Sequence, residues 1–352
     1  MNKTLLASVL SVTALASGCG GLDETSDLSV DASLGQSSSG KADSPVPTMY
    51  QCYSSPRAFS TSNKWRHTKT KLAALLGDAH PRAQDVIGPP GAVVSIDAKF
   101  AFGDVDKDIE DEKIQLYFDN CKTTVKLLDR YTDDDGRVKF SIRLPSVPGV
   151  FALYAVADGN QSYALAYAWV LPKGTHLAVS DIDGTLTTSD AEILKETVLG
   201  LLHGSYTPEA YPAAQDLTWA EASLNRIPVY LTGRPFLLKQ ATSEWLWGQG
   251  MAFGPVHVTD RDSQVLPSNS GVGAFKRDYL KGLVAAGYKL DVAFGNATTD
   301  IYAYEQAGIA KSNTYIIGKH AGESSTQAVD GSWQIIADSE SAAPPVTQPF
   351  VW

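Results

Sequence analysis

Apolar and polar residues alternate along the chain between residues 86 and 173, as they do in β-strands that bury one face. Turn sequences such as Asp135-Gly136 and Pro148-Gly149 separate the alternating runs. Short strands divided by such turns predict an antiparallel β-sandwich, and residues 69–76 before it are expected to form a short helix. The apolar positions of the clearest runs are Val94, Ile96, Ala98, Phe100 and Phe102; Ile114, Leu116 and Phe118; Val138, Phe140, Ile142 and Leu144; and Tyr163, Leu165, Tyr167 and Trp169.

The pattern changes between residues 176 and 318, where short apolar strands are followed by helix-like runs and loops. The first of these strands is Leu177-Ala178-Val179, and helix-like runs cover residues 191–202 and 211–225. Strands that alternate with helices predict a parallel sheet flanked by helices, which is an α/β domain. The length of 352 residues accommodates both domains.

The first residues have the pattern of an export signal. Lys3 precedes a small, apolar stretch that is too short for an ordinary membrane span. The stretch ends in Leu15-Ala16-Ser17-Gly18-Cys19, which resembles the lipobox of bacterial lipoproteins. That resemblance implies a lipid on Cys19, anchoring in the outer membrane or at the cell surface, and a mature chain that begins there. An ordinary signal peptide that happens to contain Cys19 is the alternative.

Composition adds a tether and a possible disulfide. Residues 20–47 are rich in serine and acidic residues and contain no aromatic residue, so we expect a disordered tether. The net charge of −10 argues against binding to nucleic acid. With Cys19 lipidated, Cys52 and Cys121 remain, and in an oxidising compartment they are expected either to form a disulfide or to stay as two separate buried thiols.

Two carboxylates stand where the first strand of the second half ends. The string Asp181-Ile182-Asp183-Gly184-Thr185 directly follows that strand, and open α/β sheets bind ligands at this end of their strands. Gly184 allows a sharp turn, while Thr185 offers a hydroxyl group and backbone donors to an anion. Such a pair can divide phosphoryl transfer between a nucleophile and a general acid and base.

The same string resembles the signature of the haloacid dehalogenase superfamily, and three further motifs follow in that superfamily's order. The second is the strand that ends in Thr232-Gly233-Arg234, and the third is the cation Lys276, with Arg277 as an alternative. The fourth is the string that runs from Asn296 to Asp300.

The extended strings narrow the resemblance. DIDGTLTTSD from Asp181, LTGRP from Leu231 and GNATTDIYAY from Gly295 resemble the catalytic domain of lipin-type phosphatidate phosphatases. They are also similar to the C-terminal domain of the Nir/RdgB phosphatidylinositol-transfer proteins. The lipin resemblance implies an immunoglobulin-like unit before the α/β domain. In the Nir relatives the domain lacks the nucleophile and binds phosphatidic acid, whereas this chain retains both aspartates.

The resemblance implies a role for each matching residue. Asp181 would be the nucleophile, Asp183 the general acid and base, and Lys276 the cation that orients Asp181. Phosphate would be bound by Gly184, Thr185, Thr232 and Gly233, and Arg234 would either bind phosphate or form a structural ion pair. Mg²⁺ would be bound by Asp181, the backbone carbonyl of Asp183 and Asn296, with Asp300 acting directly or through a neighbouring group.

These inferences predict an Mg²⁺-dependent phosphatase acting on phosphatidic acid or a related lipid phosphate. The alternatives are a phosphatase of soluble or polymer-linked phosphoesters and a non-catalytic module that binds phosphatidic acid. The gaps around the second motif are too short for a large cap domain, so an open site is expected. The predicted divisions are a signal peptide (1–18), a lipidated cysteine and tether (19–47), a β-sandwich domain (48–173), a phosphatase domain (174–340) and an irregular tail (341–352).

Overall fold

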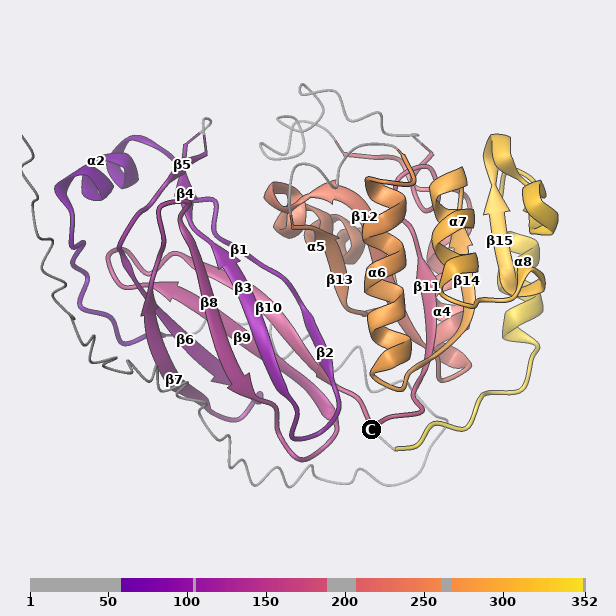
Figure 1. Ribbon diagram of the computed structural model, residues 1–352, viewed down its shortest axis with the longest axis horizontal. Helices are drawn as coiled ribbons and strands as arrows, with labels where there is room; N and C mark the ends of the chain where they lie inside the picture. Colours follow the sequence, from indigo (N-terminus) through magenta and orange to yellow (C-terminus); the bar gives the residue numbers. More distant parts are fainter. Residues whose placement is uncertain (1–57, 104–105, 189–206, 261–267, 351–352) are drawn as a thin grey trace, which may run out of the picture.

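The computed structural model describes residues 58–103, 106–188, 207–260 and 268–350. A β-rich unit lies beside an α/β unit, and residues 171–175 connect the last strand of the first to the first strand of the second (Figure 1). This confirms a β-sandwich followed by an α/β domain. The predicted signal peptide, Cys19, the tether, Cys52 and the helix-like run 191–202 lie outside the described residues.

Two sheets form the sandwich, and the alternating runs of the sequence supply most of their strands. One sheet has the order β1-β3-β8 and the other β2-β10-β9-β6-β7. Their strands pair antiparallel, except that β10 pairs with β2 in parallel. The elements of this unit are α2 (Thr68–Leu76), β1 (Arg82–Ala83), β2 (Val86–Gly88), β3 (Val93–Lys99), β4 (Ala101–Phe102), β5 (Lys107–Asp108), β6 (Lys113–Asp119), β7 (Thr124–Tyr131), β8 (Arg137–Arg143), β9 (Gly149–Ala157) and β10 (Tyr163–Val170).

Strand β9 has no polar face because both of its faces are buried. All nine of its residues are buried. Phe151 and Leu153 point into the core between the two sheets, whereas Ala152 and Tyr154 belong to a second core shared with the α/β unit. One sheet therefore contributes to two hydrophobic cores, and the two units of the chain are joined by apolar burial.

The α/β unit is a six-stranded, wholly parallel sheet with the order β13-β12-β11-β14-β15-β16. Its strands are β11 (His176–Ser180), β12 (Ile227–Pro235), β13 (Val256–Thr259), β14 (Lys289–Gly295), β15 (Thr314–Ile317) and β16 (Gln327–Val329). Its helices are α4 (Ala214–Ser223), α5 (Lys239–Gly248), α6 (Val272–Ala285), α7 (Thr298–Gln306) and α8 (Gln334–Ser341), with short 3₁₀ turns η1 (Phe236–Leu238), η3 (Lys311–Asn313), η4 (Gly318–His320) and η5 (Glu323–Ser325).

Helices cover both faces of this sheet. Residues of α6 and α7 pack with Val179 in the core shared with the sandwich, and both helices stand in front of the sheet in Figure 1. Residues of α4, α5 and α8 pack with Ala178 in a separate core on the other face. Consecutive residues of β11 thus enter opposite cores, which explains why its sequence is an uninterrupted apolar run.

The segment between β1 and β2 completes the exposed edge of the parallel sheet. The side-chain amide of Gln84 donates to the carbonyl of Val258 (2.6 Å) and accepts from its N–H (3.4 Å), as a neighbouring strand would. Asp85 accepts from the N–H of Val256 (2.8 Å) and from the Lys239 ammonium group (3.3 Å). Two side chains of the sandwich therefore occupy backbone groups that an edge strand would otherwise leave open.

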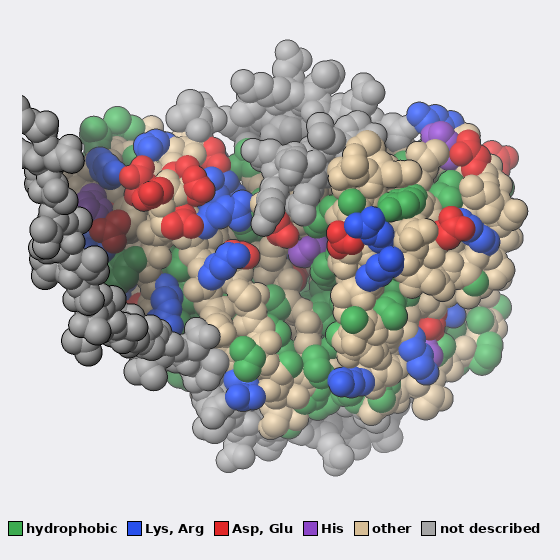
Figure 2. Space-filling view, in the orientation of Figure 1, with side chains coloured by type: hydrophobic (Ala, Val, Ile, Leu, Met, Phe, Trp, Pro, Cys, Tyr) green, Lys and Arg blue, Asp and Glu red, His purple; other side chains and the backbone are tan. Residues whose placement is uncertain are grey.

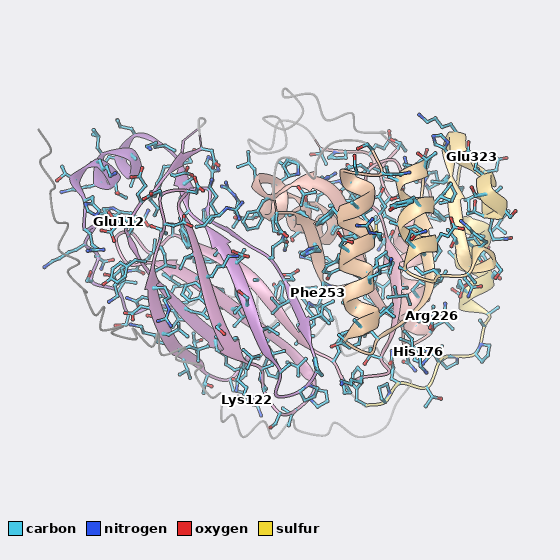
Figure 3. All side chains as sticks on the ribbon, viewed as in Figure 1. Glu112, Lys122, His176, Arg226, Phe253 and Glu323 are labelled. Atoms are coloured by element: carbon cyan, nitrogen blue, oxygen red, sulfur yellow. The ribbon has the colours of Figure 1, made fainter. Side chains whose placement is uncertain are left out.

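An aromatic cluster lies beside this contact. The ring of Phe253, labelled between the two units in Figure 3, packs on Tyr167 (4.9 Å between centroids) and Trp169 (5.1 Å) of the sandwich. It also contacts Trp247 at the end of α5 (5.0 Å). Aromatic rings in such tilted and edge-to-face contacts add to the free energy of apolar burial.

Asp85→Ala is expected to destabilise the whole chain. The substitution would leave the Lys239 ammonium, whose side chain is 4% exposed, buried without its carboxylate, at a cost of about 3–5 kcal/mol. Urea unfolding followed by tryptophan fluorescence measures the change. The double variant Asp85→Ala/Lys239→Met should recover part of the loss, and exposed Asp338→Ala should change the free energy of unfolding by less than about 0.5 kcal/mol. A double variant as unstable as the single one would contradict this explanation.

Two further predictions concern a disulfide and the C-terminal tail. Cys121 is disulfide-bonded, while its predicted partner Cys52 is not among the described residues. The tail predicted to be irregular leaves α8 and packs back, since Val346 donates to the carbonyl of Leu224 (2.9 Å). Within the described ranges, no helix is both long and apolar enough to cross a bilayer.

Candidate active site

The four sequence motifs meet at the carboxyl ends of three adjacent strands. Asp181 follows β11, Thr232 lies in the last part of β12, and Asn296 follows β14. Because these strands are parallel neighbours, their carboxyl ends share one edge of the sheet. Lys276 reaches the same place from α6. The structure therefore assembles residues that lie more than a hundred positions apart in the sequence.

Asp181 is at the centre of this arrangement and is only 4% exposed. Its Oδ1 accepts from the ammonium group of Lys276 (2.5 Å), and its Oδ2 accepts from the hydroxyl of Thr185 (3.0 Å). Its backbone N–H donates to the carbonyl of Phe294 on β14 (3.0 Å). Both the backbone and the carboxylate of Asp181 are thus held before any ligand arrives.

Lys276 bridges two carboxylates. Its ammonium group donates to Asp300 Oδ1 (2.6 Å) as well as to Asp181. The other oxygen of Asp300 accepts from the backbone N–H groups of Asn296 (3.1 Å) and Ala297 (3.0 Å). Both oxygens of Asp300 are occupied in this way, so the arrangement favours the indirect role for Asp300 over direct metal binding.

Burial governs the ionisation of this cluster. Burial raises the pKa of the Asp181 carboxyl above its ordinary value, against the opposing charge of Lys276. Burial by itself would lower the pKa of Lys276, but the two adjacent carboxylates reverse this effect and raise it. Lys276 therefore stays protonated, and its positive charge favours the ionised form of Asp181 that a nucleophile needs.

Asp183 faces away from this cluster toward Arg234. The guanidinium Nε donates to Asp183 Oδ2 (2.9 Å), and NH2 donates to Oδ1 (2.8 Å), which makes a bidentate pair. The hydroxyl of Thr232 donates to Oδ2 (3.1 Å). Arg234 is 1% exposed and also donates to Thr242 on α5 (3.1 Å). Of the two roles open to Arg234, the structure has the ion pair.

If Asp183 has the role of general acid and base that the sequence predicts, Arg234→Met is expected to lower kcat for an aryl phosphate by about 10–100-fold with little change in KM, because Arg234 holds the Asp183 carboxylate. A phosphate-binding arginine would instead raise KM. Steady-state kinetics of the full chain distinguish the two results. Arg277→Met is the matched control, since that side chain lies at the surface against Asp278 and should leave both constants nearly unchanged.

Of the remaining predicted residues, Gly184 and Thr185 lie in the turn after β11, and Gly233 lies on β12. Gly184 has φ +72°, a left-handed conformation that favours glycine, and its N–H donates to the hydroxyl of Thr187 (3.0 Å). The hydroxyl of Thr185 also lies 3.3 Å from Asn296 Oδ1, beneath the site rather than at its surface. Gly233 packs against Val272 at the start of α6.

Two residues support the site in ways that the sequence analysis did not predict. A Cβ on Gly295 would lie 2.7 Å from the Cβ of Asp300, so glycine is what lets Asp300 fold back onto the loop. The indole N–H of Trp333 donates to the carbonyl of Thr185 (2.8 Å) from the start of α8. The first could have been suspected from a glycine that ends a strand, whereas nothing near Trp333 in the sequence indicates its contact.

The oxygen atoms gathered here suit a hard cation. The Thr185 hydroxyl touches both Asp181 Oδ2 and Asn296 Oδ1, so a carboxylate oxygen and an amide oxygen lie on either side of one small side chain. Within the described residues, no group of three or more His, Cys, Asp or Glu side chains could hold a metal. A site with one carboxylate and one amide fits Mg²⁺, which keeps several waters, better than Zn²⁺.

Comparison with known domains agrees with this architecture. Residues 178–318 match the LNS2 domain of PITM 1-3, and residues 79–170 match the β-sandwich domain of PITM 1-3. The two matches follow one another as the two units of the structure do. Over these two ranges the chain is therefore similar to the LNS2 and β-sandwich domains of PITM proteins.

Individual relatives carry both units. The chain is 27% identical over 289 residues to membrane-associated phosphatidylinositol transfer protein 3 of Mus musculus, a match that covers 77% of this chain and 27% of the relative. It is 26% identical over 263 residues to protein retinal degeneration B of Drosophila melanogaster, covering 73% and 20%. The matched region is thus about a quarter of these relatives or less. A superoxide reductase from Ignicoccus hospitalis overlaps 29% of this chain and 86% of its own at 11% identity and a TM-score of 0.21, too low to support an argument.

Proposed function

We propose that this protein is an Mg²⁺-dependent phosphatase that forms an aspartyl-phosphate and acts on phosphatidic acid or a related lipid phosphate. The observation that supports this most is the contact between Lys276 and Asp181, because it sets a cation against a buried carboxylate at the edge of the sheet where ligands bind and so opposes the rise in pKa that burial causes. Asp183 stands two residues further on with its own cationic partner. A module that only binds lipid needs neither a nucleophile nor a general acid.

The residues divide the reaction into two steps. A carboxylate oxygen of Asp181 attacks phosphorus, the bond between phosphorus and the ester oxygen breaks, and the leaving alkoxide takes a proton from Asp183. Asp183 then accepts a proton from water, whose oxygen attacks the phosphoryl group and releases phosphate and free Asp181. Arg234 and Thr232 hold Asp183 between these transfers.

Asp181, the backbone carbonyl of Asp183 and Asn296 would hold Mg²⁺. When bound, the ion offsets the repulsion between an anionic nucleophile and an anionic substrate. Lys276 adds a second positive charge beside Asp181, and Asp300 fixes the position of that charge through its two hydrogen bonds to the loop after β14.

The similarity of the chain to named relatives supports a lipid phosphate as the substrate. Relatives with these two domains are named phosphatidylinositol transfer proteins and are described as membrane-associated. Those names also support the second candidate, a lipid-binding module without turnover. A lipid on Cys19 in a bacterial envelope remains a prediction of the sequence, and it would keep the site beside a membrane.

A substrate panel tests the proposal. The full chain should hydrolyse a generic aryl phosphate with Mg²⁺ and lose this activity in excess EDTA. Among natural substrates, phosphatidic acid in mixed micelles should be hydrolysed faster than glycerol phosphate or sugar phosphates. Fast turnover of soluble esters with none of lipid would favour the soluble-phosphoester alternative. Saturable binding of phosphatidic acid without any metal-dependent turnover would favour the binding module.

A further inference from the structure

Three leucines on α2 are exposed to solvent in a way that needs an explanation. Leu72, Leu75 and Leu76 are 56%, 73% and 78% exposed, and they account for three of the nine large exposed hydrophobic residues of the described chain. Their spacing of i, i+3 and i+4 places them on one face of the helix. Thr70, on the opposite face, is buried. The helix therefore has its apolar side turned outward.

This orientation is fixed by the fold. The buried carboxylate of Glu112, labelled in Figure 3, accepts from the backbone N–H groups of Arg66 (2.9 Å) and His67 (3.0 Å) just before α2. After the helix, Asp78 accepts through its carbonyl from the N–H of Gly103 (2.8 Å). Ala73 and Ala74 pack against the core of the sandwich. The helix is held at both ends and along its inner face, so the leucine face cannot simply turn inward.

Basic and aromatic side chains border the leucine face. Lys69 and Lys71 are exposed beside it, and Lys69 is paired with Glu110 (2.7 Å). Arg66 lies over the ring of Tyr131 (4.5 Å to the centroid), and Tyr131 is itself 54% exposed. Glu110 and Asp111 pair with Lys69 and Arg66, so the border is mixed in charge, with Lys71 exposed beside the leucines. Exposed leucines beside lysine and tyrosine are found on helices that lie in the interface of a lipid bilayer.

Helix α2 and the candidate active site belong to different units but lie toward the same side of the molecule. In Figure 1 the helix lies at the upper edge of the molecule, and the carboxyl ends of β11, β12 and β14 point to the same edge. Figure 2 shows hydrophobic side chains at this corner, next to lysine and arginine and to a cluster of Asp and Glu side chains. In this view, α2 and the carboxyl ends of these strands therefore lie toward the same side of the molecule.

We propose that the leucine face of α2, formed by Leu72, Leu75 and Leu76, inserts into a phospholipid bilayer and docks the open edge of the α/β domain on it. The lysines beside it would contact anionic headgroups, and the site would receive a phosphate that projects from the same bilayer. This inference rests on the proposed function, because docking would bring the phosphatase site to its lipid substrate. Docking and turnover are measured by separate experiments.

Vesicle sedimentation tests the docking directly. The full chain carrying Cys19→Ser, which cannot be lipidated at that residue, is mixed with vesicles of phosphatidylcholine containing one fifth phosphatidic acid. We expect binding, and we expect the triple variant Leu72→Ser/Leu75→Ser/Leu76→Ser to bind at least tenfold more weakly. Val284→Ser is the matched control, since this residue is 44% exposed and lies in the last turn of α6, at the opposite end of that helix from Val272, which packs beside Gly233. It should bind like the parent.

Activity on a soluble aryl phosphate separates docking from folding and from catalysis. The triple variant should hydrolyse the soluble ester at the parent rate while losing activity on vesicles. Unchanged vesicle binding by the triple variant would overturn the proposal. So would a triple variant that binds normally but melts at a lower temperature, because the leucines would then be covered by another part of the chain. Weakened vesicle binding in a protein inactive on every ester would support docking and reject the phosphatase.

Discussion

Asp181→Asn should abolish hydrolysis of both aryl phosphate and phosphatidic acid, with kcat reduced on the order of 10³-fold or more. An amide oxygen is too weak a nucleophile to attack phosphorus, and no other described carboxylate contacts both Lys276 and the end of β11. Because burial already penalises the charge of Asp181, a neutral isostere should fold, with Lys276 still paired to Asp300.

The measurement is a single-turnover assay with Mg²⁺, combined with a test for phosphate covalently bound to protein. The parent should accumulate acid-stable aspartyl-phosphate when quenched, and the variant should show none. Phosphatidic acid binding by the variant should persist, which separates loss of chemistry from loss of the site. Turnover undiminished in Asp181→Asn would exclude the proposed nucleophile.

Lys276→Met should have the second largest effect, because it reduces both activity and stability. Without the ammonium group, the buried carboxylates of Asp181 and Asp300 face each other without a counter-charge, which costs about 3–5 kcal/mol of unfolding free energy. The same loss removes the charge that opposes the effect of burial on Asp181, so its pKa should rise further and kcat should fall by at least about 10²-fold.

A second substitution separates these two effects. In Lys276→Met/Asp300→Asn, one of the uncompensated charges is removed, so urea unfolding should show part of the stability restored. Activity should remain low, since Asp181 still lacks its cation. If Arg277 rather than Lys276 were the functional cation, Arg277→Met would reduce activity and Lys276→Met would act on stability alone. The comparison therefore decides between two adjacent residues of the sequence.

The sandwich illustrates which strands a sequence can reveal. Strands β3 and β8 were predicted because solvent on one side makes their residues alternate. Strand β9 carries no such alternation, since its two faces enter two cores and all its positions must be apolar or small. The second core belongs to a domain that follows later in the chain, and no local pattern encodes that.

The site shows a similar division. Parallel neighbouring strands bring the predicted motifs to one edge of the sheet. The sequence therefore allowed us to predict that Asp181, Lys276 and Asn296 lie close together. The partner of Arg234 could not be predicted from the sequence, because an arginine at the end of a strand can either face a ligand or pair with a carboxylate. Trp333 reaches the site from 148 residues beyond Thr185, and its contact depends on tertiary packing alone.

The contact of Gln84 and Asp85 with β13 has a consequence for any work on fragments. A polypeptide that begins at residue 174 would lack both side chains and would leave the edge of β13 and the apolar side of α6 open to other molecules. Such a fragment would be prone to aggregate, and a negative result obtained with it would say nothing about lipid. We therefore expect the boundary near residue 173 to divide the chain into two folds, but not into two polypeptides that stay soluble apart.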